Sequence, residues 1–154
     1  MALIGTYECK MDAKGRLILP QALRKQLLSY GGGNFILKRS VFENALELYP
    51  ESEWQGVFSE VNKLNRFVRE NAQFIRSFTA GVKIIEIEES GRLLVSKDLK
   101  GYAGLKKELV LVSCGNMIEI WDKKSYEKAI DISAEAFSAL AEQVMGKKEE
   151  EDGV

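Results

Sequence analysis

The chain has 154 residues, of which 45% are hydrophobic and 29% are charged, and its formal net charge is −1. This composition indicates a globular protein of one domain or two very small ones, and it excludes a disordered chain. No apolar run approaches the roughly 20 residues of a membrane helix, and the N-terminus lacks the basic and apolar regions of a signal peptide. We therefore expect a cytoplasmic protein with no membrane contact.

The residue types that catalysis needs are missing or scattered. The sequence has no histidine, which removes Ser-His-Asp and Cys-His catalysis and most zinc sites. Its two cysteines, Cys9 and Cys114, are far apart and indicate two buried thiols rather than a disulfide framework. The glycine triplet at 31–33 lacks the Lys-Ser/Thr that follows in a phosphate-binding loop. We expect no enzyme, no cofactor, no metal site and no small-molecule substrate.

The first third of the chain alternates short strand patterns with one helix. The expected strands are residues 6–11, 16–19, 35–37 and 46–49. A turn at 12–15 joins the first two strands, because Asp12 opens a turn by bonding the backbone and Gly15 accepts a positive φ. An amphipathic helix is expected between Pro20 and the glycine triplet.

A long helical segment follows Pro50, which suits the first turn of a helix. Its apolar positions form a seam that is interrupted once, by Asn71, and widened by three phenylalanines, Phe58, Phe67 and Phe74. The seam itself consists of Trp54, Val57, Val61, Leu64, Val68, Ile75 and Phe78. We expect a break near 62–65, with Asn65 capping a second helix. The seam is expected to pack on the sheets or on a neighbouring subunit.

The second half of the sequence repeats the scheme of the first. Strands are expected near 82–87, 93–95, 108–112 and 117–121, with a helical turn around 99–103. One last helix is expected over about 125–145. Its buried side would consist of Tyr126, Ala129, Ile130, Phe137, Leu140, Ala141 and Val144.

The two halves are related by an internal duplication. The segment Asp12-Ala13-Lys14-Gly15-Arg16 returns 76 residues later as Glu88-Glu89-Ser90-Gly91-Arg92, and Leu46-Glu47-Leu48-Tyr49 returns after 72 residues as Ile118-Glu119-Ile120-Trp121. One such unit is too small to bury a core alone. Two units related by a pseudo-twofold axis would let each hairpin complete the core of the other.

The repeats suggest an organisation in four parts. We expect a first repeat at 5–53, a helical connector at 54–81 and a second repeat at 82–125. A C-terminal helix with an acidic tail would occupy 126–154.

Charge is distributed unevenly along the chain. Residues 1–40 carry seven basic and two acidic side chains, whereas residues 41–60 carry five acidic side chains and no basic one. Residues 61–76 are basic again, with four bases against one acid. A nearly neutral protein can therefore present one basic surface.

The duplicated motif, with Pro20 and the helix of Arg24 after its first copy, resembles the MraZ family over essentially residues 1–145. The segments Tyr102-Ala103-Gly104-Leu105 and Glu119-Ile120-Trp121 add to the resemblance. It implies an α+β fold in which two tandem AbrB-like (SpoVT-AbrB) swapped-hairpin units form a pseudo-twofold, barrel-like core.

The resemblance also implies a function. Members of the family are bacterial DNA-binding transcriptional regulators of the division and cell-wall gene cluster. We therefore expect a cytoplasmic, nucleoid-associated protein that forms a ring-shaped homo-oligomer and binds double-stranded DNA through basic hairpin loops.

The motif match assigns roles to individual residues. The expected DNA-binding residues are Lys14, Arg16, Arg24 and Arg92, and the expected structural residues of the motif are Asp12, Gly15, Glu88 and Gly91. The second copy lacks a basic residue at Ser90, and residues 83–100 are charge-neutral, with four bases and four acids. We expect this copy to be mainly structural.

Two alternatives stay open at this stage. Asp12 and Arg16 flank one turn, so they could pair with each other or with a neighbouring subunit and leave Arg16 unavailable to DNA. The whole protein could instead be an oligomeric scaffold or adaptor that binds a protein partner through its helical face.

Overall fold

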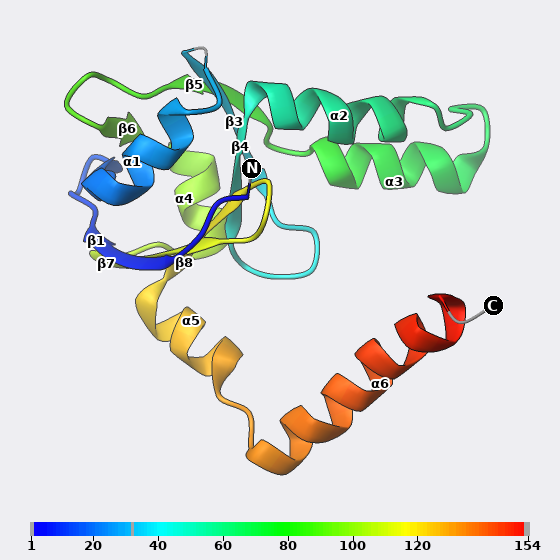
Figure 1. Ribbon diagram of the computed structural model, residues 1–154. Helices are drawn as coiled ribbons and strands as arrows, with labels where there is room; N and C mark the ends of the chain where they lie inside the picture. The colour runs from blue at the N-terminus through cyan, green and yellow to red at the C-terminus, as the bar shows by residue number, and fades with distance from the viewer. Residues whose placement is uncertain (1, 32, 153–154) are drawn as a thin grey trace. The chain divides into compact units, whose positions relative to one another are not determined.

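The computed structural model describes the backbone of residues 2–31 and 33–152 (Figure 1). The chain divides into two compact units, residues 1–123 and 124–154. The strands are β1 (Thr6–Lys10), β2 (Arg16–Ile18), β3 (Asn34–Arg39), β4 (Leu46–Pro50), β5 (Lys83–Glu86), β6 (Arg92–Leu94), β7 (Glu108–Ser113) and β8 (Ile118–Asp122). The helices are α1 (Gln21–Leu28), α2 (Glu51–Asn62), α3 (Arg69–Thr79), α4 (Lys97–Ala103), α5 (Lys123–Ile130) and α6 (Ala134–Asp152).

The strands of the two repeats are interleaved. Six strands form one antiparallel sheet in the order β1-β7-β8-β4-β3-β5, and β2 pairs with β6 in a separate two-stranded ladder. β1 and β2 therefore pair with strands of the second repeat, while β5 and β6 pair with strands of the first. The prediction that each hairpin completes the core of the other repeat is confirmed by this pairing.

One face of the sheet packs against the two short helices α1 and α4. Both helices have fully buried leucines, Leu23 and Leu27 in α1 and Leu99 in α4. These side chains meet inward-facing strand residues such as Leu37 and Leu111. Burying a leucine contributes roughly 1.5–3 kcal/mol, so this cluster supplies most of the apolar stabilisation of the first unit.

The opposite face of β3 and β4 is covered by α2 and α3, which run side by side in Figure 1. Ile36 points to this face because its neighbours in β3 point to the other one. It clusters with Tyr49 and Trp54. Trp54 of α2 stacks on Phe78 of α3, with ring centroids 5.8 Å apart. Part of the predicted apolar seam therefore packs on the sheet, as expected.

A buried cation lies beneath these helices. Lys38 of β3 is 0% exposed and pairs with Glu47 of β4, with 3.1 Å between Nζ and Oε1. Its ammonium also donates to the Arg39 carbonyl oxygen and lies 4.5 Å from the centroid of the Phe78 ring. Tyr49 donates its hydroxyl to the same Glu47 oxygen at 3.2 Å. This network stabilises the contact of α3 with the sheet through charge as well as apolar burial.

The predicted break between the two connecting helices is confirmed, but the predicted cap is wrong. α2 ends at Asn62, and Val68 rather than Asn65 precedes α3. The Asn65 side chain instead accepts a hydrogen bond from the Phe67 N–H, and its carbonyl accepts one from the Val68 N–H. Asn65 thus closes the turn that precedes α3 and does not cap the helix itself.

The C-terminal unit also differs from expectation. The predicted single helix is interrupted at 131–133, where α5 has ended and α6 has not begun. Ser133 explains the restart, because its hydroxyl accepts from the Ala136 N–H at 3.1 Å, which is N-cap geometry. The predicted buried side is exposed in this chain: Ile130, Phe137, Leu140 and Val144 are each between 48% and 60% exposed.

The expectation of two buried thiols holds only in part, and one residue of the glycine triplet lies outside the described residues. Cys9 is half-buried as a free thiol, but Cys114 is exposed, because it follows β7 in the turn that leads to β8. Burial nevertheless raises the pKa of both thiols to about 11, and the Glu119 carboxylate adds to the effect at Cys114. Of the glycine triplet, Gly31 adopts a φ of +73° after α1, whereas Gly32 lies outside the described residues.

Candidate nucleic-acid interface

The turn between β1 and β2 is built around the Asp12 side chain. Its Oδ1 accepts hydrogen bonds from the backbone N–H groups of Lys14 and Arg16, at 2.9 and 3.0 Å. The Gly15 N–H bonds the Asp12 carbonyl oxygen, and Gly15 has a φ of +85°, which only glycine adopts without strain. The motif thus folds as its residue types predict, and it holds the Lys14 side chain at an exposed hairpin tip.

The same carboxylate also holds the motif arginine. Arg16 Nε donates to Asp12 Oδ2 at 2.7 Å, with both side chains about two-fifths exposed. Hydrogen bonds from Arg16 and Lys14 lower the pKa of Asp12, the Arg16 backbone N–H being the largest cause. Within the described part of the chain, no hydrogen bond reaches the two terminal nitrogens of Arg16. One edge of this guanidinium is therefore available to a further acceptor.

The second hairpin repeats the backbone geometry of the first but differs in the contacts of its carboxylate. The Glu88 N–H and the Gly91 N–H make the same backbone bonds, at 2.9 and 2.8 Å, and Gly91 also has a φ of +85°. Glu88 is one methylene longer than Asp12, and its two oxygens accept from Arg92 Nε at 2.7 Å and from Arg92 Nη2 at 3.2 Å. Two of the three guanidinium nitrogens of Arg92 thus already donate to a carboxylate in the free protein.

The two hairpins lie against each other through the β2–β6 ladder. Leu17 and Leu93 face each other on the inner side and are each 1% exposed. Arg16 is opposite Leu94 and Arg92 is opposite Ile18, so the two arginines are diagonal neighbours on the outer face. Arg16 lowers the pKa of Glu88 after the larger effects of Arg92, which agrees with this proximity. The structure therefore brings two predicted DNA-binding residues together.

A groove of about 530 Å³ opens beside this ladder. It is lined by four basic residues, one acidic residue and two apolar residues: Lys10, Arg16, Arg92, Lys107, Asp12, Met11 and Ile18. The sequence alone does not predict that Lys107 lies in this groove, because only the register of β7 against β1 brings it there. Its carbonyl oxygen accepts from the Met11 N–H at 2.8 Å. The groove therefore contains cations from both repeats.

The helix of each repeat supplies a further cation to the hairpin of the other. The Arg24 side chain of α1 lies against Gly91, since a Cβ on that glycine would be 3.3 Å from Arg24 Cδ. Lys100 of α4 donates from Nζ to the Ala13 carbonyl oxygen at 3.4 Å. Lys100 is 76 residues after Arg24. The 76-residue offset of the duplication, applied to Arg24, identifies Lys100 as its equivalent.

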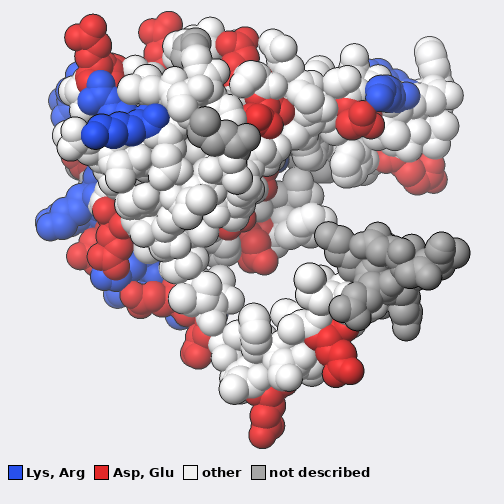
Figure 2. All heavy atoms as spheres, in the orientation of Figure 1, with Lys and Arg blue, Asp and Glu red and all other residues white. Residues whose placement is uncertain are grey.

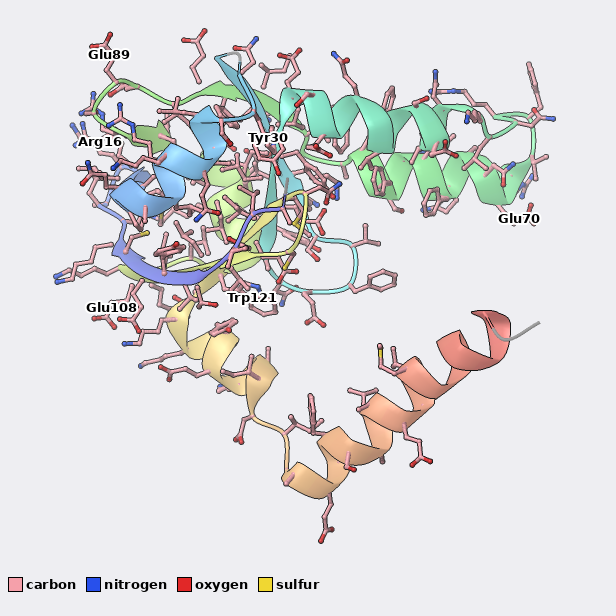
Figure 3. The ribbon with its side chains drawn as sticks, viewed as in Figure 1. Arg16, Tyr30, Glu70, Glu89, Glu108 and Trp121 are labelled. Atoms are coloured by element: carbon pink, nitrogen blue, oxygen red, sulfur yellow. The ribbon has the colours of Figure 1, made fainter. Side chains whose placement is uncertain are left out.

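Many basic side chains of the first unit lie around the two hairpins. Figure 2 shows Lys and Arg side chains over the region of β1, β2, β6 and α1, with acidic side chains between them, and a further basic group at the far end of α2 and α3. In the side-chain view, Arg16 lies in this region with Glu89 and Glu108 on either side of it (Figure 3). Several cations arranged in this way can make phosphate contacts with an extended polyanion.

The described residues hold neither a candidate metal site nor a candidate membrane-spanning helix. No group of three or more metal-ligating side chains occurs in residues 2–31 and 33–146. Likewise, no helix in the described part of the chain has the length and apolarity that crossing a membrane requires.

These features define a class of protein: two tandem copies of one β unit that exchange their hairpins and present paired arginines. Residues 2–77 and 78–148 each match the family model described as “MraZ protein, putative antitoxin-like”. The chain belongs to the MraZ family. The resemblance of the duplicated motif to this family is thereby confirmed.

Similar proteins match this chain over almost its whole length. A protein of Christiangramia forsetii named “Transcriptional regulator MraZ” is 55% identical over 152 residues, covering 99% of this chain and 97% of the relative. A protein of the same name from Flavobacterium psychrophilum is 55% identical and covers 97% of this chain and 96% of its own length. Another, from Cytophaga hutchinsonii, is 36% identical and covers 96% of this chain and 97% of its own length. The family is one of transcriptional regulators, not of enzymes.

Proposed function

We propose that this protein is a DNA-binding transcriptional regulator that contacts promoter DNA through its hairpin loops. The observation that carries the proposal is the pair of adjacent arginines on the outer face of the β2–β6 ladder, beside Lys10 and Lys107. The names of the relatives support the regulatory role. The DNA-binding set of the proposal is Lys14, Arg16, Arg24 and Arg92.

The first hairpin is the main contact in this proposal. Arg16 keeps its terminal nitrogens available, and Lys14 projects at the tip with its backbone held by Asp12. Arg92 contributes less, because Glu88 occupies two of its nitrogens. Asp12, Gly15, Glu88 and Gly91 hold the loops in shape rather than bind DNA.

We also propose the assembly that such weak contacts require. Single phosphate contacts are weak, and a ring of subunits sums them into useful affinity. Exposed apolar side chains on the helices, including Phe74 at 47% and Phe137 at 60%, support association between copies. The exchanged strands support an AbrB-like, barrel-like core with repeats at 5–53 and 82–125, a connector at 54–81 and a C-terminal segment at 126–154.

The remaining parts of the proposal concern the cell. The protein would reside in the cytoplasm on the nucleoid and act on the division and cell-wall gene cluster, as the family resemblance implies.

A second candidate function is that of an oligomeric adaptor, and one observation favours it. The turn between α2 and α3 exposes three apolar side chains, Leu64 at 36%, Phe67 at 99% and Val68 at 41%, which together offer an apolar surface to a protein partner.

A gel shift with the purified full-length chain separates the two candidates. The probes are a duplex from upstream of its own gene cluster and an unrelated duplex of equal length, each at two salt concentrations. The proposal expects tighter binding to the first duplex and weaker binding to both at higher salt. Absence of binding to either duplex at low salt would leave the adaptor function instead.

A further inference from the structure

The two sides of the β2–β6 ladder are related by the pseudo-twofold axis but differ in charge. On one side, Lys10 of β1 is opposite Glu108 of β7. The equivalent pair on the other side is Glu86 of β5 and Asn34 of β3. Glu86 therefore stands where the first side has Lys10, and Gly33 stands where it has Lys107.

This exchange inverts the electrostatic character of the two sides. The first side has Lys10, Lys107 and the tip residue Lys14 against Asp12 and Glu108. The equivalent positions on the second side hold two acidic residues, Glu86 and Glu88, and no basic residue, and Glu89 stands where the first side has Ala13. Glu108 offsets part of the positive charge on the first side, but it lies outside the groove that Lys10 and Lys107 line.

The groove is also shaped to concentrate its charge. Met11, which is 3% exposed, forms part of an apolar lining next to the four cations. Apolar walls lower the local dielectric constant and strengthen the field of charges beside them. Both lysines are exposed, and no ion pair holds either of them among the described residues.

We propose that the DNA backbone crosses the ladder on its Lys10–Lys107 side, where a phosphate is held between Arg16 and the two lysines. The inference rests on the proposed function and adds the direction of the DNA path and two binding residues from different repeats. The Glu86 side repels the backbone and faces away from it. Each subunit thus presents DNA with one basic side, despite its nearly symmetric fold.

The test is a salt titration of duplex binding by the full-length chain and four variants, with Arg16→Ala as a fifth variant that reports loss of binding. Lys10→Gln and Lys107→Gln each remove one phosphate contact, so each should flatten the slope of log affinity against log salt by about 0.9 per bound site. Glu86→Gln removes the matched acid on the other side and should leave the slope unchanged. Lys63→Gln removes a lysine at the C-terminal end of α2 that is 67% exposed and pairs with Glu60, and it serves as the control.

The outcomes separate the inference from the function on which it rests. Flatter slopes for both groove variants, with the wild-type slope for Lys63→Gln, support the proposed path. Wild-type slopes for both groove variants, in a protein whose binding is still lost on Arg16→Ala, overturn the path and leave the function. A wild-type protein that binds no duplex overturns the proposed function itself.

Discussion

The carbonyl oxygen of Gly15 accepts a hydrogen bond from the Val95 N–H at 2.8 Å, and this bond joins the hairpin of one repeat to the strand end of the other. A Cβ at Gly15 would lie 2.5 Å from the Val95 carbonyl oxygen, which is backbone and cannot move aside easily. Gly15→Ala should therefore cost more than the roughly 1–2 kcal/mol of a left-handed non-glycine residue. Urea unfolding measures the loss.

Gly91→Ala is the matched comparison. It has the same φ of +85°, but the nearest atoms to its Cβ would be those of the flexible Arg24 side chain, at 3.3 Å, and the Leu19 carbonyl oxygen, at 3.6 Å. Its loss of unfolding free energy should be limited to the backbone strain. Equal losses in the two variants would contradict the close approach at Gly15.

The buried ion pair between Lys38 and Glu47 should be sensitive to removal of its anion. Glu47→Gln keeps the shape of the side chain but leaves the fully buried ammonium without a counter-charge, at a cost of about 3 kcal/mol or more. The exposed pair of Lys63 and Glu60 provides the control, because Glu60→Gln should cost less than about 1 kcal/mol. Similar melting temperatures for the two variants would show that the Lys38 charge is stabilised in another way.

The helical connector makes a similar contrast between two apolar positions. Val61 is 8% exposed and Leu64 is 36% exposed. Val61→Asp should destabilise the fold by about 3 kcal/mol, because it buries an unpaired charge. Leu64→Asp should change the melting temperature much less, and a smaller oligomer mass by light scattering would place Leu64 between copies. A Val61→Asp variant with wild-type melting would contradict the packing described for α2.

Acid should weaken the first hairpin through Asp12. Its pKa is lowered in the folded state, chiefly by the hydrogen bond from the Arg16 N–H. Its contribution to stability is therefore complete above the unfolded pKa of about 4 and is lost as the pH falls through the folded value. Asp12→Asn should be less stable than wild type at pH 7, and the difference should shrink below pH 4. A constant difference from pH 7 to pH 2 would exclude this charge as the cause.

Sequence patterns predicted the local elements well and the long-range pairing only in outline. The turn at 12–15 and the helix over Gln21–Leu28 follow from residues close together in the chain, which is why both expectations are confirmed. The place of Lys107 in the groove depends on the register of β7 against β1. No local pattern encodes a register between strands about 100 residues apart.

The errors have similar physical causes. The apolar spacing continues from Ile130 to Phe137, so periodicity alone predicted one C-terminal helix where a Ser133 cap starts a second. Asn65 closes a turn and does not cap a helix, and the residue type alone predicts either role, because both use a side-chain oxygen that accepts from a nearby backbone N–H. The unequal charge of the two motif copies predicts unequal DNA contact by Arg16 and Arg92, and this stays a prediction.

We propose that DNA contact depends mainly on the first hairpin, and parallel measurements on Arg16→Ala and Arg92→Ala test this proposal. Duplex affinity, melting temperature and oligomer mass are measured for both variants beside the wild-type protein. Arg16→Ala should abolish measurable binding with the fold and mass intact, because every subunit of an assembly loses a contact at once. Arg92→Ala, whose guanidinium is already held by Glu88, should keep much of the affinity. Equal losses of affinity in intact assemblies would contradict the claim, as would a folded Arg16→Ala variant that binds DNA like the wild-type protein.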